Sequence, residues 1–218
     1  MTSAGRSFLG HIARVIPGLD LSRSFYADAV APIVAERYPR LSYAAGLLGT
    51  GSATLGFDTP RSMDHWWGPR LEIFLRSEDA TPELCAEIHT VLANLLPFEF
   101  RGLPTHMQEV NRATGTVFMA STTQRPINHL VRVTTVREFL TNYIGAQPLD
   151  EPLLVAQWLA MSEQHLRTVA SGGVWHDEPG ELSRAREILP KLATSSVRSP
   201  QFHEPPITPP RTARSSAA

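Results

Sequence analysis

Two apolar segments joined through a glycine turn constrain the fold of this chain more than any other part of its sequence. The first apolar segment is Leu41–Leu48, the second is Leu71–Leu75, and Gly49-Thr-Gly-Ser52 follows the first one directly. Short apolar runs bounded by turn residues are typical of buried strands. The sequence therefore predicts a strand, a glycine turn, a connecting segment and a second strand, with both strands in one sheet.

The connection between these strands contains a hydroxyl and a carboxylate at a spacing that chemistry could use. Ser52 ends the glycine turn, and eleven residues separate it from Asp64. A Walker phosphate-binding loop is excluded, because Gly51 is not followed by Lys and then Ser or Thr. A Rossmann loop is also excluded, because Thr54 leads into a loop-forming segment and not directly into a helix. The simplest alternative is a turn that only connects strands, with Asp64 as a loop carboxylate.

Six short segments carry the most distinctive patterns of the chain. They are Gly18–Tyr26, Gly49–Ser52, Leu55–Asp58, Arg61–Arg70, Val133–Val136 and Trp175–Asp177. Together they resemble an uncharacterised bacterial family of nucleotidyltransferase-like proteins, a domain of unknown function with a polymerase-beta-type fold. The segment Arg61–Arg70, which reads Asp-His-Trp-Trp-Gly-Pro-Arg over its last seven residues, is the most specific part of this resemblance.

The resemblance implies an α+β fold, in which a nucleotidyltransferase-like mixed sheet is packed by helices. It also implies transfer of a nucleotidyl group from a nucleoside triphosphate to an unknown hydroxyl acceptor. In that superfamily a Gly-Ser turn contacts the triphosphate, and paired carboxylates with a third on a neighbouring strand hold divalent metal ions. Gly51 and Ser52 match the turn, and Asp64 matches the first carboxylate, which is the implied catalytic residue and a ligand of Mg²⁺. Trp66 falls at the second carboxylate position and could stack on a nucleotide base.

Two positions of the implied metal site hold residues that do not bind Mg²⁺. Trp66 has no oxygen ligand, and Arg132 lies between two valines in the run where the third carboxylate is expected. Because Mg²⁺ requires oxygen ligands and an arginine repels it, these residues argue against a two-metal centre. Glu72 is a substitute ligand, eight residues after Asp64. Three hypotheses stay open: an active transferase, a catalytically inactive nucleotide-binding or regulatory relative, and a truncated, non-functional remnant.

Composition excludes several classes of protein. The chain has 218 residues, of which 42% are hydrophobic and 19% charged, so it can bury a sizeable core. The net charge of −1 gives no strong signal for binding nucleic acid. The single cysteine, Cys85, excludes an internal disulfide and predicts a cytoplasmic protein. No membrane span is expected, because no apolar run reaches the roughly 18 residues that a span requires.

Helix caps and apolar residues at helical spacing predict five helices. Their first residues or caps are Asp20, Thr81, Thr135, Glu151 and Ser162. Pro32 should kink the first helix, Pro97 should end the second, and Gly145 should end the third. Cys85 and His89 should lie on the second helix as ordinary packing residues, without a reactive thiol. Thr116–Ala120 and the run that ends at Val133 are predicted strands.

The predicted strands lie early in the chain and most of the later helices follow Pro148. We therefore predict a nucleotidyltransferase-like core over 1–147, the start of a C-terminal helical region over 148–190, and a disordered Pro/Ser/Arg-rich tail over 191–218. His176 and Asp177 should form a solvated turn and not a metal site. The resembled family continues with further aromatic-rich helices, so we interpret the tail as a foreign or frame-shifted ending on a truncated member.

Overall fold

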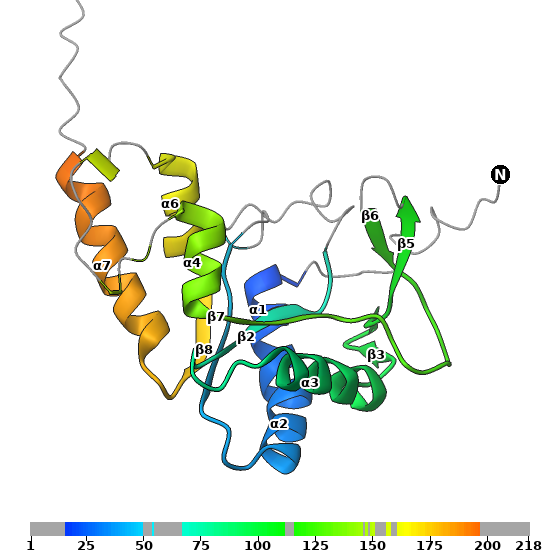
Figure 1. Cartoon of the computed structure of the whole chain (residues 1–218). Coiled ribbons are helices and arrows are strands. Elements are labelled where there is room, and N and C mark those ends of the chain that lie inside the picture. The colour runs from blue at the N-terminus through cyan, green and yellow to red at the C-terminus, as the bar shows by residue number, and fades with distance from the viewer. Residues whose placement is uncertain are drawn as a thin grey trace, which may run out of the picture.

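The computed structural model has a central β-sheet with helices on both of its faces (Figure 1). It describes residues 16–49, 54, 67–111, 116–145, 147, 149–150, 156–157 and 161–196. Two clusters of buried side chains, one on each face, join the helices to the sheet. The protein is therefore of the α+β class, with a mixed sheet packed by helices, as the sequence predicts.

The sheet has four strands in the order β7-β2-β1-β8. They are β1 (Tyr43–Leu47), β2 (Arg70–Leu75), β7 (Leu130–Thr135) and β8 (Gly173–Asp177). β1 runs antiparallel to both β2 and β8, whereas β2 runs parallel to β7. The two strands predicted on either side of the glycine turn are confirmed, and so is the strand predicted to run through Val133.

Strand β2 is buried on both faces of the sheet. Because successive side chains of a strand point to opposite faces, β2 supplies side chains to both clusters. Leu71, Ile73 and Leu75 pack against the N-terminal helices, and Phe74 packs against the C-terminal ones. Glu72 lies on the same face as Phe74, so a carboxyl group lies beside the apolar cluster of the C-terminal helices.

The helical segment before β1 contains a π-helical turn. Helix α1 (Gly18–Phe25) continues through η3 (Tyr26–Val30), the π-helical turn, into α2 (Ala31–Arg37). Its fully buried apolar residues are Leu21, Phe25, Val30 and Val34. The step of five residues from Phe25 to Val30 is wider than an α-helix requires and is typical of a π turn. After this turn Val34 is the fully buried residue, and Ile33 is partly buried.

One detail of this segment differs from the sequence prediction, and the position of Pro32 is a second point of note. Asp20 lies inside α1, whose N-cap is Pro17, so the predicted cap at Asp20 is wrong. Pro32 lies in the first turn of α2, immediately after the π turn. Pro32 lacks a backbone N–H, and it lies where the regular helical hydrogen-bond pattern is already changed by the π turn.

Helix α3 (Pro82–Leu95) covers the same face of the sheet and begins as predicted. The hydroxyl of Thr81 accepts a hydrogen bond from the Leu84 backbone N–H at 3.2 Å. Ile88 and Leu92 are fully buried, whereas Leu95 is exposed. The next residue, Leu96, is fully buried, because the chain leaves the helix there and turns toward the core.

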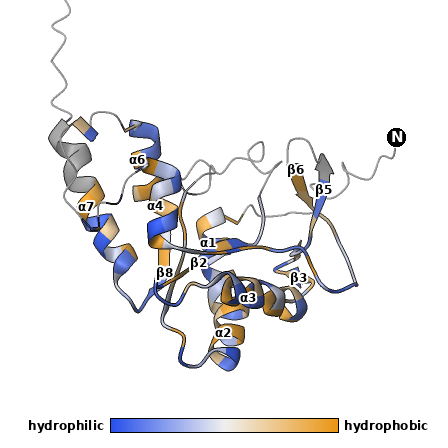
Figure 2. Cartoon of the chain, in the orientation of Figure 1, coloured by the Kyte–Doolittle hydropathy of each residue, from blue (hydrophilic) through white to orange (hydrophobic). Residues whose placement is uncertain are grey.

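Three helices pack against the other face of the sheet. They are α4 (Val136–Ile144), α6 (Glu163–Ala170) and α7 (Glu181–Ser196). Apolar residues of all three join Phe74 in one buried cluster. Figure 2 shows hydrophobic and hydrophilic residues side by side on α3 and α4, as is typical of helices with one buried side.

Two small antiparallel ribbons lie outside the main sheet. They are β3 (Glu99–Phe100) with β4 (Leu103–Pro104), and β5 (Met107–Asn111) with β6 (Thr116–Met119). The strand predicted over Thr116–Ala120 is therefore confirmed to within one residue. In Figure 1 the β5–β6 hairpin projects from the side of the molecule opposite α7.

The C-terminal part of the chain contributes a strand as well as helices. β8 forms hydrogen bonds with β1, and the sequence analysis does not predict this strand. Helix α6 begins after Ser162 as predicted, and α7 continues past Leu189 to Ser196. Most of the helix predicted to begin at Glu151, and residues 197–218, lie outside the described residues. In the described part of the chain, no helix has the length and apolar character to cross a membrane.

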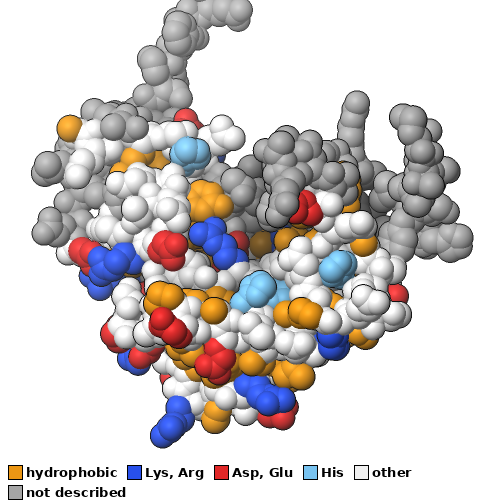
Figure 3. All heavy atoms as spheres, turned by 45° about the vertical axis from the view of Figure 1, so that its right-hand side comes forward, with side chains coloured by type: hydrophobic (Ala, Val, Ile, Leu, Met, Phe, Trp, Pro, Cys, Tyr) orange, Lys and Arg blue, Asp and Glu red, His pale blue; other side chains and the backbone are white. Residues whose placement is uncertain are grey.

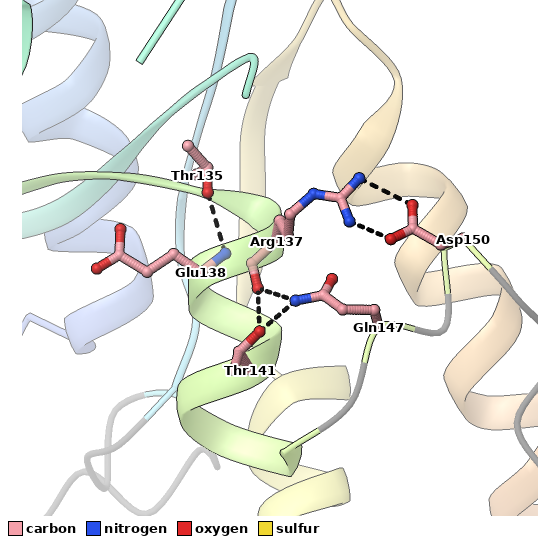
Figure 4. Close-up of polar contacts among 6 residues, drawn as sticks. All are labelled: Thr135, Arg137, Glu138, Thr141, Gln147 and Asp150. Carbon is pink, nitrogen blue, oxygen red and sulfur yellow. Dashed lines mark hydrogen bonds and ion pairs between the residues drawn. The ribbon is translucent and has the colours of Figure 1, made fainter. Parts of the chain in front are cut away.

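The helix cap predicted at Thr135 is confirmed for α4, and Figure 4 shows its contacts. The Thr135 hydroxyl accepts a hydrogen bond from the Glu138 backbone N–H at 3.0 Å. Gly145 ends the helix in the left-handed conformation, with φ of 67°. Arg137 forms an ion pair with Asp150, and Gln147 Nε2 donates to the Arg137 carbonyl at 2.8 Å. These contacts fix the start of α4 directly after β7.

We predict that Thr135→Ala lowers the free energy of unfolding by about 1 kcal/mol, because the Glu138 N–H loses its acceptor. Thr135→Ser is the matched control, since it keeps the hydroxyl and should retain most of the stability. Urea denaturation followed by circular dichroism measures both variants. Equal stability of the two variants would contradict a capping role for the hydroxyl.

Candidate functional site

Of the residues predicted to form the site, only Glu72 belongs to the described part of the chain. Gly51, Ser52, Asp64 and Trp66 lie outside the described residues. The structure nevertheless defines the surroundings of the glycine turn, because β1, Gly49 and Thr54 are described. The site can therefore be built from the elements that border this turn.

The turn begins with a glycine that no other residue can replace without strain. Gly49 is buried and has φ of +83°, a conformation that favours glycine. A Cβ atom added there would collide with the Tyr143 hydroxyl of α4. The Thr54 hydroxyl donates a hydrogen bond to the Gly49 carbonyl at 2.8 Å, so both ends of the segment 49–54 are held together.

Glu72 places a carboxyl group next to this turn. Its Oε2 atom accepts a hydrogen bond at 3.2 Å from the backbone N–H of Leu48, the residue before Gly49. Its strand pairs with β1 so that Glu72 lies opposite Gly46, which has no side chain to cover it. Burial raises the pKa of Glu72 from 4.5 to about 7, although the hydrogen bond from Leu48 favours the charged form.

Two arginines flank Glu72 on the same face of the sheet. Arg70 lies two residues earlier on β2, and Arg132 is the neighbour of Glu72 in the parallel register of β2 with β7. Both positive charges lower the pKa of Glu72, but burial has the larger effect. The resemblance places a third carboxylate on the strand that is β7 in the structure. The residue of β7 that pairs with Glu72 is Arg132, so an arginine stands where the carboxylate is expected.

The described residues do not fit a divalent metal ion. Mg²⁺ binds hard oxygen ligands, usually carboxylates together with water and phosphate. Here one carboxyl group lies between two guanidinium groups, whose charge opposes a cation. Among the described residues, no three His, Cys, Asp or Glu side chains come close enough together to hold a metal ion.

A cavity of about 550 Å³ opens beside Glu72. It extends along β7 and reaches α3 on one side and Tyr143 of α4 on the other. Its lining residues are Arg70, Leu71, Glu72, Cys85, Ala86, His89, His129, Leu130, Val131, Arg132, Val133 and Tyr143. Figure 3 shows basic, acidic, histidine and hydrophobic side chains gathered around a hollow on one face of the molecule. The cavity therefore lies along the edge strand β7 and is lined by both charged and apolar residues.

His129 forms a structural part of this wall. Its Nδ1 atom accepts a hydrogen bond from the Val131 N–H at 3.1 Å, and its Nε2 atom contacts the His89 carbonyl at 3.0 Å. This pairing requires the neutral ring with its proton on Nε2. Burial lowers the pKa of His129 to about 4, and the ring packs against the tilted ring of His89 with centroids 4.3 Å apart. His129 therefore connects β7 to α3 as a neutral side chain.

Cys85 also faces the cavity, from α3. Burial raises the pKa of its thiol, and the charge of Glu138 acts in the same direction. A thiolate is the reactive form of cysteine, and both effects disfavour it. This agrees with the prediction of a packing role.

His176 and Asp177 lie in strand β8, so the prediction that they form a solvated turn is wrong. β1 offers an antiparallel edge to which Gly173–Asp177 pairs. The His176 ring packs against Tyr43 with centroids 4.6 Å apart. Asp177 Oδ2 accepts a hydrogen bond from the Ser183 N–H in the first turn of α7 at 2.7 Å. The two side chains thus have separate structural partners.

Sequence reasoning named Glu72 and Arg132 but missed three other residues of the cavity. Arg70 could have been found, because it precedes Glu72 by two residues and must share its face in a strand. Tyr143 and His129 carry no such signal. Their place depends on how α4 and α3 pack on the sheet, which no local pattern specifies.

In comparisons with known proteins, no protein-family model, no curated protein and no solved structure matches the chain.

We predict that Glu72→Gln stabilises the protein above neutral pH. Folding raises the pKa of this carboxyl group from 4.5 to about 7, so its contribution to stability is full below pH 4.5 and is lost as the pH rises through 7. Glutamine keeps an acceptor for Leu48 and carries no charge. The variant should exceed the wild type at pH 8 by roughly 2 to 3 kcal/mol in free energy of unfolding, and the two should converge near pH 4.5.

Urea denaturation between pH 4.5 and pH 8 tests this prediction. The control is Glu36→Gln, which replaces an exposed carboxylate on α2 and should follow the wild type. If the free energies of unfolding of Glu72→Gln and of the wild type change with pH by the same amount, burial does not disfavour the charged form of Glu72.

We predict that His129→Asn costs about 1 to 2 kcal/mol at pH 7.5, because asparagine can accept the Val131 hydrogen bond but lacks the ring nitrogen that donates to His89. The folded-state pKa of about 4 lies below the ordinary 6.5. In the wild type, the contribution of His129 to the free energy of unfolding is therefore full above pH 6.5 and is lost as the pH falls toward 4. The variant should lose less stability over that range than the wild type or the exposed control His165→Asn.

Proposed function

We propose that this chain is a nucleotidyltransferase-like protein that binds a nucleoside triphosphate and lacks the two-metal chemistry of an active transferase. One observation carries the proposal: Glu72, the only described carboxyl group beside the glycine turn, lies between Arg70 and Arg132 on one face of the sheet. Such a group of charges favours an anion over a cation. It suits the phosphates of a nucleotide and opposes Mg²⁺.

The arrangement of strands supports the proposed relationship. The glycine turn follows β1, the next strand β2 is antiparallel to β1, and β7 lies parallel on the far side of β2. The resemblance assigns the carboxylates of an active site to positions after the turn and on a neighbouring strand. In this chain the neighbouring strand brings Arg132 beside Glu72.

Each residue near the turn has a proposed role. The backbone of Gly51 and the hydroxyl of Ser52 contact phosphate oxygens, and Trp66 stacks on the base. Arg70 and Arg132 supply positive charge in place of metal ions, because a guanidinium group binds phosphate with two parallel hydrogen bonds. Asp64 is then an acid without a partner carboxylate, and binding does not depend on it.

A second candidate is an active transferase in which Asp64 and Glu72 are the ligands of Mg²⁺ and an unknown hydroxyl compound is the acceptor. The observation in its favour is the hydrogen bond between the Glu72 carboxyl and the Leu48 N–H, which holds this acid next to the turn. The two candidates differ in their response to metal ions and to loss of Asp64.

Calorimetric titration with the four nucleoside triphosphates, in Mg²⁺ and in a chelator, distinguishes these candidates. We expect binding that persists in the chelator and in Asp64→Ala. Ser52→Ala should weaken it by up to about tenfold, the value of one hydrogen bond to a charged group, whereas the exposed control Ser77→Ala should not change it. Binding that requires Mg²⁺ and disappears in Asp64→Ala would instead support the active transferase. Absence of binding to every nucleotide would overturn the proposal and favour a non-functional remnant.

A further inference from the structure

Strand β7 forms one edge of the main sheet and has no second partner among the described strands. All of its residues pair in regular parallel register with β2. The strand at the opposite edge, β8, pairs with β1 through a register shift between Ala45 and Gly46, which is typical of a β-bulge. A bulge disrupts the hydrogen-bond ladder, whereas a regular edge presents one to another chain. Of the two edges, β7 is therefore the one suited to accept a further strand.

Four backbone groups of β7 point to this open edge. In a parallel pair, every second residue directs its N–H and C=O groups to the partner strand. Val131 is not one of these residues, because its N–H donates to His129 Nδ1 at 3.1 Å. The C=O of Val131, both backbone groups of Val133 and the N–H of Thr135 therefore point away from β2. None of the four has a hydrogen-bond partner in the described part of the chain.

The four groups are complementary to those of a second copy. If two β7 strands run antiparallel with Val133 of one copy opposite Val133 of the other, these two residues exchange N–H···O bonds. The same register places the Thr135 N–H opposite the C=O of the partner's Val131. The two groups that this register leaves over are already in use. The Val131 N–H is bonded to His129, and the C=O of Thr135, as the N-cap, accepts the first hydrogen bond of α4.

The charges beside this edge also match those of a second copy. Arg132 and Glu138 are both exposed, and neither forms an ion pair within the described residues. Glu138 Oε2 accepts a hydrogen bond from the Thr134 hydroxyl at 2.8 Å. In the register centred on Val133, Arg132 lies opposite the partner's Thr134 on the same face of the sheet, and so comes near the partner's Glu138. A two-fold axis repeats this contact.

The other charges on this face favour the same kind of partner. Arg70 and Glu72 lie next to Arg132 and carry opposite signs. The face therefore presents both positive and negative groups, and a ligand of a single charge does not match it as a whole. A copy of the same surface does, because each arginine of one chain can then face an acid of the other.

We infer that two copies of this chain associate through β7, antiparallel and centred on Val133, so that the sheet continues from one copy into the other. The cavity along Leu130–Val133 keeps this edge accessible. One short strand from each copy makes a small contact, so the dimer should be in a concentration-dependent equilibrium with the monomer. The inference does not rest on the proposed function.

Charge reversal tests the inference, with sedimentation equilibrium of the full chain at rising protein concentration as the measurement. Arg132→Glu and Glu138→Arg should each weaken the dimer about tenfold, because each change places like charges opposite one another at both symmetric contacts. Mixing the two variants should restore association, since opposite charges then face each other again. The exposed control Arg40→Glu should leave the dimer unchanged. A wild type that stays monomeric at every concentration, or variants that do not associate when mixed, would overturn the inference.

Amide hydrogen exchange of the wild type locates the contact independently of any variant. We expect the N–H groups of Val133 and Thr135 to exchange more slowly as the protein concentration rises, because they gain acceptors in the dimer. Val131 is the internal control, since its N–H already has an acceptor in the monomer. A dimer that leaves the exchange of Val133 and Thr135 unchanged would show that another surface forms the contact, and would also overturn the inference.

The two proposals can fail separately. Both use Arg132, so the dimer is measured without nucleotide. If nucleoside triphosphates bind to a chain that stays monomeric, the inference about β7 is wrong and the proposed function stands. If the charge-reversed variants associate only when mixed and no nucleoside triphosphate binds, the proposed nucleotide function is wrong and the pairing of β7 stands.

Discussion

The in-register pairing of β2 with β7 is the contact on which the site depends. It brings Glu72 beside Arg132, and the alternation of β2 brings Arg70 to the same face. A shift of one residue would send each of these side chains to the opposite face, where Leu71, Ile73 and Leu75 form the apolar core. The hydrophobic alternation of β2 therefore fixes the register, and the register in turn determines which charges meet. The six residues of β2 thus contribute both to the packing of the core and to the charges of the site.

In the proposed function, the charges around Glu72 are the reason why the site would take phosphate in preference to a metal ion. A buried carboxylate that binds Mg²⁺ is normally supported by further oxygens, whereas this one has a backbone N–H and two arginines around it. Burial also raises the pKa of Glu72 to about 7, and this favours the neutral form of its carboxyl group. Among the described residues, the Leu48 N–H donates a hydrogen bond to this carboxyl group.

The parts of the fold that depend on local sequence were predictable, and those that depend on distant partners were not. Thr135 and Gly145 mark the ends of α4, and the apolar runs on either side of the glycine turn mark β1 and β2, because caps and strands have local signals. Strand β8 has five residues with glycine at its start, and only pairing with β1 makes it a strand. For the site, Glu72 and Arg132 were named from their strands. Tyr143 and His129 line the cavity because of how α4 and α3 pack on the sheet, and the local sequence pattern does not predict this packing.

Strand β8 also has a consequence for how the protein is made. β1 lies near the start of the chain and β8 near its end, with the remaining sheet strands between them. During synthesis β1 can pair with β2 early, while among the described strands its other edge gains a partner only when β8 has been made. An open edge of that kind is a template for pairing with other chains. The sheet is therefore incomplete in the interval between the synthesis of β2 and that of β8.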